Sequence, residues 1–401
     1  MRSATDGFRF QVSVRTLLPS RGLRFLKPET RNLPPRIRVS HILALLALLA
    51  PLPAPGAPDF AAIAARLEPI RVRHHLPALA GAFLTHTGLV AVAATGVRKA
   101  GEETRATADD CWHLGSDTKA MTAVLLGRLV DEGRLQWTNT LAEIFPELAD
   151  GMAPEFRAVT VVHLLSHRAG LPHDLDWSKL SRRGTLPEQR LAALREATAR
   201  KPDSKPGDRY AYSNAGYVLA GAVLERAGGA PWEEQIEANL FRPLGMTGAG
   251  FGGTGTPGRL DQPWGHTAGA KPVNRNGPAE DNPPIMRPAG GVHAPLADWA
   301  KFVADVLRGA RGEPSRLRPE TARALRTPPF GGDYAFGWLV VPRPWAGGLA
   351  LTHAGCNTMN YAVAWLAPGK DFAVLVCANQ GDGEAAKACD EAASALIGLL
   401  Q

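Results

Sequence analysis

The chain has 401 residues, of which 45% are hydrophobic and 21% charged, a composition typical of globular proteins and not of disordered or fibrous ones. Its 45 basic residues exceed its 38 acidic residues, which gives a formal net charge of +7. This excess lies in residues 1–57, which hold nine Lys or Arg and two Asp or Glu, so the rest of the chain carries 36 of each sign. A neutral body has little affinity for phosphate backbones, and we expect no nucleic-acid partner. Because no run of 18 apolar residues is present, the sequence predicts no stable membrane span in the mature chain.

The first 57 residues resemble a targeting segment. The apolar run 42–50 (ILALLALLA) follows Arg36 and Arg38, and small residues and prolines lead from it to Ala57. A basic flank, a short apolar stretch and a small-residue exit are the marks of a secretory signal peptide. We therefore expect residues 1–57 to be leader and signal peptide, with the Arg- and Pro-rich stretch 1–35 either a disordered leader or a mis-assigned start. The mature protein is then exported, to the periplasm or the medium.

The next predicted elements are a β-hairpin and a largely helical stretch. Residues 80–98 alternate apolar and small side chains around a Thr-Gly turn, which indicates a hairpin. After Gly115 the apolar residues recur at three- and four-residue intervals until Gly133, which predicts a helix. Further helical patterns follow at 159–167, 187–199, 214–227 and 232–240.

The second half of the chain returns to strands. Residues 253–288 are rich in Gly and Pro and indicate a loop, followed by a helix at 295–308. Strand patterns occupy 360–366 and 372–378, and an amphipathic segment closes the chain at 384–400. This order predicts an α+β fold, an antiparallel β-sheet flanked by helices and formed from both ends of the chain, with an inserted mostly helical domain. The predicted boundaries are 58–115 and 290–401 for the first domain and 116–289 for the helical one.

The first motif with chemical potential is Ser116-Asp-Thr-Lys119 at the start of the first predicted helix. Residues three apart share a helix face, so the Lys119 amine can reach the Ser116 hydroxyl. A serine hydroxyl becomes a good nucleophile when a neighbouring base takes its proton, and a desolvated lysine with a lowered pKa can do this. The helix N-terminus also favours developing negative charge.

Two further motifs follow in order. Tyr212-Ser-Asn214 offers a phenol that can relay protons, with a pKa expected to be lowered by a nearby lysine, and an amide that can bind a substrate carbonyl. His353-Ala-Gly355, followed by Cys356, places a histidine and small residues at the edge of a strand, where a substrate backbone can approach.

Metal and disulfide chemistry have weaker signals. His163 and His167 are four residues apart on a predicted helix, but no carboxylate accompanies them in a zinc-binding pattern, and we expect no metal and no other cofactor. The four cysteines permit disulfides in an exported protein, but their spacing does not give a pairing, and buried free thiols fit equally well.

Taken together, five ordered segments resemble the serine β-lactamase and penicillin-binding-protein family, nearest to its class C β-lactamase-related branch. The segments are His113-Leu-Gly-Ser-Asp-Thr-Lys119, Leu164-Leu-Ser-His-Arg-Ala-Gly-Leu-Pro172, Tyr212-Ser-Asn-Ala-Gly-Tyr217, Pro243-Leu-Gly-Met-Thr247 and His353-Ala-Gly355. The resemblance covers about residues 60 to 400. It implies a serine acyl-enzyme mechanism on an ester, a D-amino-acid peptide or a β-lactam-like amide.

The resemblance also implies roles for single residues. Ser116 matches the nucleophile, Lys119 its basic partner and Tyr212 the tyrosine of the second motif, and either Lys119 or Tyr212 can be the acylation base. Substrate-binding positions match Asn214, His353 and Gly355, and the backbone N–H groups of Ser116 and Cys356 match the oxyanion hole.

One position departs from the family pattern. Many β-lactamases have Lys-Thr-Gly where this chain has His353-Ala-Gly, so a permanent cation is replaced by a group largely neutral at pH 7. This favours an esterase or peptidase over efficient β-lactam hydrolysis. A true class C-type β-lactamase or DD-peptidase, and a non-catalytic protein that binds cell-wall ligands, are the alternatives. The oligomeric state is left open.

Overall fold

The computed structural model describes residues 59–400. The predicted leader and signal peptide, residues 1–57, lie outside the described residues. None of the helices formed by residues 59–400 combines the length and hydropathy of a membrane-spanning segment.

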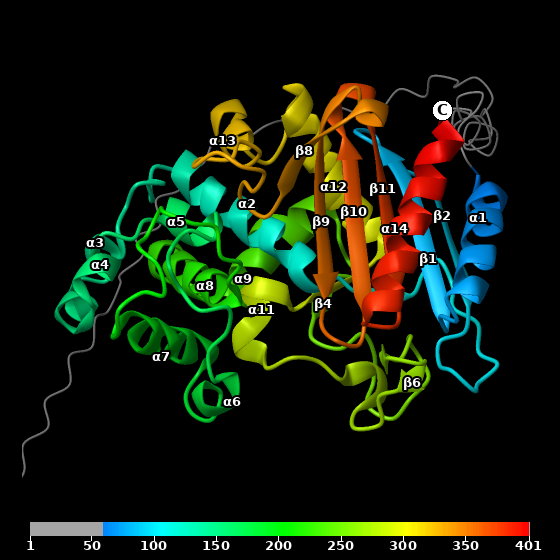
Figure 1. Cartoon of the computed structure of the whole chain (residues 1–401), viewed down its shortest axis with the longest axis horizontal. Helices are drawn as coiled ribbons and strands as arrows, with labels where there is room; N and C mark the ends of the chain where they lie inside the picture. Colours follow the sequence, from blue (N-terminus) through cyan, green and yellow to red (C-terminus); the bar gives the residue numbers. More distant parts are fainter. Residues whose placement is uncertain (1–58, 401) are drawn as a thin grey trace, which may run out of the picture. The chain divides into compact units, whose positions relative to one another are not determined.

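A six-stranded antiparallel sheet is built from the two ends of the described chain (Figure 1). Its strand order is β2-β1-β11-β10-β9-β8, and Leu79 of β1 lies opposite Ala378 of β11. The sheet and the helices beside it confirm the predicted fold class. The strands are β1 (Ala78–Thr85), β2 (Gly88–Gly96), β8 (Leu339–Arg343), β9 (Gly348–Cys356), β10 (Tyr361–Ala367) and β11 (Phe372–Ala378).

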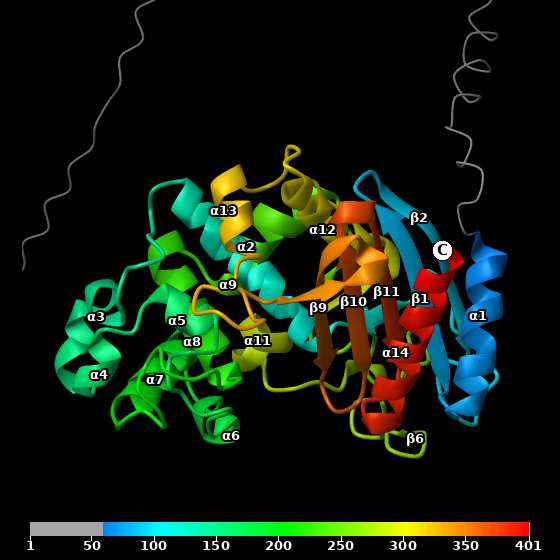
Figure 2. The same cartoon turned by 45° about the horizontal axis from the view of Figure 1, so that its top comes forward.

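Helices cover both faces of this sheet (Figure 2). On one face, α1 (Phe60–Arg73) and α14 (Gly383–Ile397) pack against it, and on the other lies α12 (Leu296–Arg311). Successive side chains of a strand point to opposite faces of the sheet. Leu79 and Phe83 of β1 therefore pack in the hydrophobic core beneath α1 and α14, whereas the alanines between them pack in the core that includes α12. Both faces are therefore buried, which explains why β11 is apolar throughout.

The remaining elements are mostly short helices around two longer buried ones. Helices α2 and α8 are buried along most of their length and form the centre of this region. The helices are α2 (Thr118–Asp131), α3 (Leu141–Ile144), α4 (Pro154–Arg157), α5 (Val161–Leu165), α6 (Trp177–Leu180), α7 (Leu186–Thr198), α8 (Asn214–Gly228), α9 (Trp232–Ile236), α10 (Arg242–Leu244), α11 (Arg287–Gly290) and α13 (Pro319–Ala324). Two small sheets complete the structure. One has three strands in the order β3 (Cys111–His113), β7 (Val292–Pro295) and β4 (Gly250–Phe251), and the other pairs β5 (His266–Thr267) with β6 (Lys271–Pro272).

Several local predictions were wrong. Helix α1 was not predicted, because Pro69 lies inside it and interrupts the pattern of a regular helix. Strands β8 and β9 were also missed. The helix predicted at 159–167 is the five-residue α5, and His167 follows it with φ of +57°, so His163 and His167 do not share a helix. Helix α9 ends at Ile236 and continues as a π-helical turn over 237–241.

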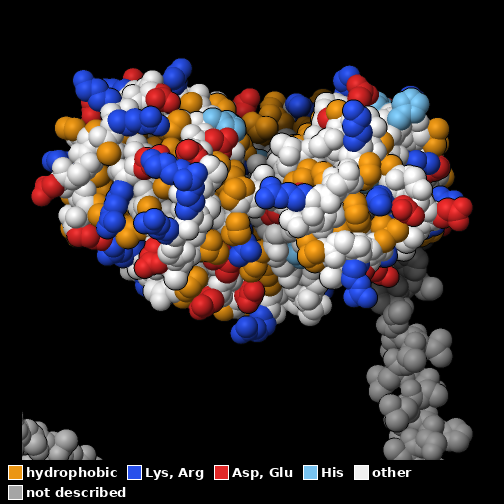
Figure 3. Space-filling model, turned by 90° about the horizontal axis from the view of Figure 1, so that it is seen from below, with side chains coloured by type: hydrophobic (Ala, Val, Ile, Leu, Met, Phe, Trp, Pro, Cys, Tyr) orange, Lys and Arg blue, Asp and Glu red, His pale blue; other side chains and the backbone are white. Residues whose placement is uncertain are grey.

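The surface carries both signs of charge. On the face in Figure 3, Lys and Arg side chains lie among Asp, Glu and hydrophobic side chains. This distribution agrees with the balance of 36 basic and 36 acidic residues after position 57.

A buried ion network joins three helices of the inserted region. Arg190 on α7 is fully buried, donates to Glu233 on α9 at 2.6 Å and to Glu225 on α8, and its Nε donates to the Ile285 carbonyl at 3.2 Å. Replacing Arg190 with alanine leaves the largely buried Glu225 without a cation, whereas Glu233 keeps only a longer contact with Arg287 at 3.5 Å. Because uncompensated buried charges are costly, we expect a loss of roughly 3–5 kcal/mol in the free energy of unfolding, measured by urea denaturation. The exposed Arg195 on the same helix gives the control Arg195→Ala. If both alanine variants changed the free energy of unfolding by the same small amount, this account would be contradicted.

Candidate active site

The serine of the first motif lies at a sharp turn between a strand and a helix. Strand β3 ends at His113, Gly115 adopts a left-handed φ of +51°, and a 3₁₀ turn over Gly115–Asp117 runs directly into α2. Ser116 is half-buried in this turn. Its hydroxyl therefore lies at the N-terminal end of a helix, where backbone N–H groups point toward it.

Lys119 lies one turn further along, with its side chain completely buried. Its Nζ donates to Ser116 Oγ at 3.0 Å, to Asn214 Oδ1 at 2.8 Å and to the Ala289 carbonyl at 2.7 Å. Burial lowers the pKa of Lys119 from 10.5 to about 7, against the opposing effect of Asp174 and Asp117. The amine therefore exchanges between its charged and neutral forms near neutral pH.

Asn214 is the first residue of α8 and is held from both sides of its amide. Its Oδ1 accepts from Lys119, and its Nδ2 donates to Asp174 Oδ1 at 3.1 Å. Asp174 also accepts from the indole of Trp177 at 2.9 Å, so the carboxylate is fixed. These contacts leave the second Nδ2 hydrogen of Asn214 for another acceptor. Asp174 has no recognisable signal in the sequence, since it lies in a loop of unremarkable composition.

Tyr212 is packed in a cluster of aromatic rings. Its ring centroid lies 4.3 Å from that of His167, which also contacts Tyr210, Tyr217 and Tyr334. Lys119 Nζ lies 4.8 Å from the Tyr212 ring centroid. The expected lowering of the tyrosine pKa is wrong, because burial raises the pKa of Tyr212 well above 10 and the Ser116 hydroxyl offsets this only in part. The phenol is therefore neutral at pH 7.

His353 lies on β9, close to the same cluster. Its Nε2 is 3.2 Å from the Tyr334 hydroxyl, and its side chain is buried. Burial, helped by the charge of Lys119, lowers the pKa of His353 to about 3. The imidazole is therefore neutral over the physiological range, as the substitution of the family lysine suggested.

The end of β9 touches the serine turn through glycines. A Cβ placed on Gly355 would lie 2.6 Å from the Ser116 amide nitrogen, and one placed on Gly115 would lie 2.5 Å from the Cys356 amide nitrogen. Only residues without a side chain allow two backbones to approach this closely. The N–H groups of Ser116 and Cys356 thus come from two segments in direct contact. The four cysteines are free thiols, and the Cys356 side chain is exposed.

Asp117, next to the serine, is an unusual buried acid. Neither of its carboxylate oxygens has a hydrogen-bond partner in the described residues, and burial raises its pKa well above 3.8 despite the charge of Lys119. A neutral carboxylic acid is the form that such a site favours.

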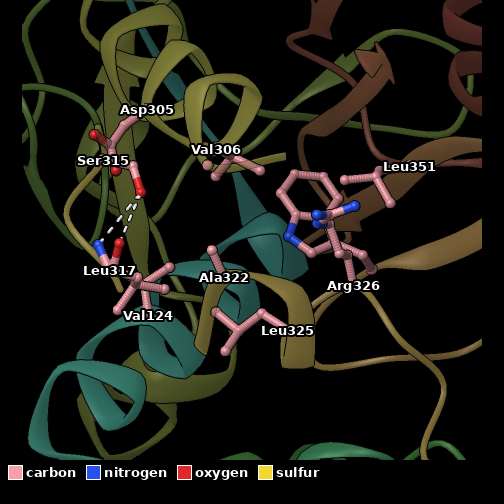
Figure 4. Close-up of a pocket in the computed structure, with 11 residues that line it drawn as sticks. Val124, Asp305, Val306, Ser315, Leu317, Ala322, Leu325, Arg326 and Leu351 are labelled. Carbon is pink, nitrogen blue, oxygen red and sulfur yellow. Dashed lines mark hydrogen bonds between the residues drawn. The ribbon is translucent and has the colours of Figure 1, made fainter. Parts of the chain in front are cut away.

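Two pockets differ in their relation to these residues. The pocket in Figure 4, with about 380 Å³ of empty volume, is lined by side chains of α2, α12 and α13 such as Val124, Val306 and Ala322, and by none of the predicted site residues. The second has about 580 Å³ of empty volume, partly open to solvent, and Tyr210 and Tyr334 of the aromatic cluster line it. Tyr210 and Tyr334 connect this second pocket to His167, and the Tyr334 hydroxyl connects it to His353. Within residues 59–400, no group of three or more His, Cys, Asp or Glu side chains is arranged to hold a metal.

The fold and the geometry define a class. An antiparallel sheet beside a helical region, with a serine and a buried lysine one helical turn apart, is the arrangement of the serine hydrolases related to β-lactamases and penicillin-binding proteins. The chain belongs to the Beta-lactamase family, whose family model matches residues 60–398. The resemblance inferred from the five motifs is thereby confirmed.

Known relatives agree with this membership. The chain is 32% identical over 182 residues to penicillin-binding protein 4 of Amycolatopsis lactamdurans, covering 45% of this chain and 46% of that protein. It thus spans about half the length of that relative. Among solved structures, the octameric penicillin-binding protein homologue from Pyrococcus abyssi superposes with a TM-score of 0.68 at 22% identity, covering 84% of this chain and 77% of that one. D-alanine carboxypeptidase AmpC from Burkholderia cenocepacia gives 0.66 at 20% identity, covering 84% and 98%. At these identities the two structures establish the fold.

Proposed function

We propose that the protein is an exported serine hydrolase that forms an acyl-enzyme through Ser116, with Lys119 as the base that activates it. The observation that carries this proposal is the buried amine of Lys119, 3.0 Å from Ser116 Oγ and with a pKa of about 7. A base whose pKa lies near the working pH is both available and strong enough to take a proton.

The three contacts of Lys119 favour it as the base over Tyr212. As an ammonium, Lys119 donates to Ser116, Asn214 and the Ala289 carbonyl. The amide oxygen of Asn214 and the backbone carbonyl can only accept, so a neutral amine uses its two hydrogens on them. Its lone pair is then left facing the Ser116 hydroxyl. The raised pKa keeps Tyr212 a neutral phenol at pH 7, so it supplies no phenolate that could remove the Ser116 proton.

The reaction that follows is an acyl transfer in two stages. The Ser116 proton passes to Lys119 as Oγ bonds to the substrate carbonyl carbon, and the bond to the leaving group breaks when that group receives the proton through Tyr212. Water then attacks the acyl-enzyme, gives a proton back through Lys119, and releases the acid with Ser116 restored. The N–H groups of Ser116 and Cys356 bind the oxyanion, and one such donor contributes roughly 10² to 10³ in rate.

Substrate binding is assigned to residues around this centre. The free Nδ2 hydrogen of Asn214 binds a substrate carbonyl, and the strand edge at His353 and Gly355 receives the substrate backbone. Because His353 is neutral, this edge lacks the cation that pairs with a substrate carboxylate. The pocket lined by Tyr210 and Tyr334 accepts an apolar group. These features favour an ester or an uncharged amide.

D-amino-acid peptides and β-lactam-like amides remain in the proposal because of the relatives. One is named penicillin-binding protein 4 and another, in Escherichia coli, is named a putative D-alanyl-D-alanine carboxypeptidase. Cell-wall peptides lie outside the cytoplasm, which agrees with the signal-peptide pattern at 42–50.

Covalent labelling tests the proposal directly. The purified protein is treated with a fluorophosphonate and, separately, with a fluorescent penicillin, and the adduct is located by mass spectrometry of the intact chain and of its peptides. We expect a single adduct on Ser116. A protein that gains no adduct with either probe class, and sequesters peptidoglycan fragments without turnover, would instead be a non-catalytic binding protein.

A further inference from the structure

Three buried polar side chains behind the serine turn form a connected group that the proposed reaction does not use. They are His113 at the end of β3, Asp281 in the loop that precedes α11, and Asn357 directly after β9. His113 Nε2 lies 2.9 Å from Asp281 Oδ1, and Asn357 Nδ2 donates to the same oxygen at 3.1 Å. The side chains of His113 and Asp281 are 1% and 9% exposed, so water does not screen these contacts.

At one end, the group fixes the turn that carries the nucleophile. His113 Nδ1 accepts from the Gly115 N–H at 3.1 Å, and Gly115 is the left-handed residue immediately before Ser116. Because Nδ1 is an acceptor, the imidazole carries a proton on Nε2, the nitrogen that faces Asp281. The carboxylate therefore determines the orientation of a ring that holds the Gly115 backbone.

At the other end, the group fixes the turn that follows Cys356. Asn357 Oδ1 accepts from the backbone N–H of Asn360 at 2.9 Å and from that of Met359 at 3.3 Å. These contacts determine which way the amide faces, and they direct its Nδ2 to Asp281. The backbone at Cys356 is thereby tied to the same carboxylate oxygen as the backbone at Gly115.

From this geometry we propose that Asp281 is a positioning residue that fixes the separation of the two N–H donors of the oxyanion hole. It contacts His113, which binds the backbone next to Ser116, and Asn357, which directly follows Cys356. The inference rests on the proposed function. Oxyanion donors act only when they point at the place where the negative charge develops, so the separation of two donors from two different segments must be fixed. Asp281 belongs to neither segment and links both.

Both contacts of Asp281 meet at one carboxylate oxygen, Oδ1. Burial acts to raise the pKa of Asp281, but His113 and Asn357 outweigh burial and hold the pKa below its ordinary value. The carboxylate is therefore stabilised by those two partners. Because the short His113 contact and the Asn357 hydrogen bond converge on Oδ1, an asparagine at position 281 keeps an oxygen for both partners, whereas alanine keeps none.

The experiment compares Asp281→Ala with Asp281→Asn. The readouts are the rate constant for fluorophosphonate labelling of Ser116 and the kcat and KM for a p-nitrophenyl ester. We expect Asp281→Ala to lower kcat and the labelling rate about ten- to hundredfold with KM changed less than about twofold, because the loss falls on the transition state. Asp281→Asn should retain most of the activity. The exposed Asp261, in the same part of the chain, gives the matched control Asp261→Ala, which should behave like the wild type.

His113→Asn covers the case in which Asp281→Ala does not fold. The shorter amide can accept the Gly115 N–H but does not extend to Asp281, so it should lower kcat to a similar degree. Wild-type rates in either folded variant, or a rise in KM at constant kcat, would overturn the positioning role. A wild-type protein that is neither labelled nor active would instead refute the proposed function, so the two failures are distinguishable.

Discussion

Replacement of Ser116 with alanine is expected to lower kcat by about 10³-fold or more and to abolish labelling by fluorophosphonates. The reason is that covalent catalysis needs the Oγ atom, and the remaining oxyanion donors support only residual turnover. Steady-state hydrolysis of a p-nitrophenyl ester and mass spectrometry of the treated protein measure both effects. Since Ser116 is half-buried and its replacement by alanine removes only the hydroxyl, the variant should remain folded.

A second serine provides the control. Ser394 is exposed on α14, on the face of the sheet opposite α12, and Ser394→Ala should hydrolyse and label like the wild type. Hydrolysis by Ser116→Ala at more than about one-tenth of the wild-type rate would refute the nucleophile assignment.

The second large effect concerns Lys119 and pH. A pKa of about 7 for a base that must be neutral predicts that acylation is slow below pH 6, rises through pH 7 and levels off above pH 8. Lys119→Met removes the base and should lower the acylation rate by roughly 10² to 10⁴-fold, with no rise near pH 7. Stopped-flow labelling from pH 5 to 9 measures both. Lys387, exposed on α14, gives the control Lys387→Met, and a flat wild-type profile would contradict the role of Lys119.

Tyr212→Phe separates the two possible bases. If Lys119 is the base, the phenylalanine variant loses rate, by about 10 to 10²-fold, but keeps the rise near pH 7. If the tyrosine were the base, the rise would disappear with the hydroxyl. The double variant Ser116→Ala with Lys119→Met should be no slower than the slower of the two single variants, because a nucleophile and its base act as a unit.

The fold was predictable where the local pattern and the final environment agree. The hairpin at 80–98 and the strands at 360–366 and 372–378 became β1, β2, β10 and β11, because their apolar residues are buried. Strand β9 was missed because it contains glycines and a histidine whose place in the sheet depends on pairing with β10. Such pairing is a tertiary effect that short-range periodicity does not contain.

The active site was also predictable only in part. Ser116 and Lys119 are three residues apart, so their contact follows from helical geometry, and the structure places Asn214 against the same amine. The electrostatics did not follow from the sequence. Tyr212 was expected to have a lowered pKa beside a cation, but its burial among aromatic rings raises the pKa instead. Asp174 and Asp281 were not found at all, since each acts across loops distant in sequence.

The pairing of β1 with β11 also bears on the biosynthesis of the protein. The central strands of the sheet come from opposite ends of the chain, and β9, which faces the serine turn, joins the sheet through β10 and β11. Contacts so distant in sequence form late in folding, because the intervening chain must lose its entropy first. A chain still emerging from a ribosome or a translocation pore therefore lacks the strands that complete the site. The hydrolytic activity proposed for Ser116 would therefore require the chain to be complete through β11.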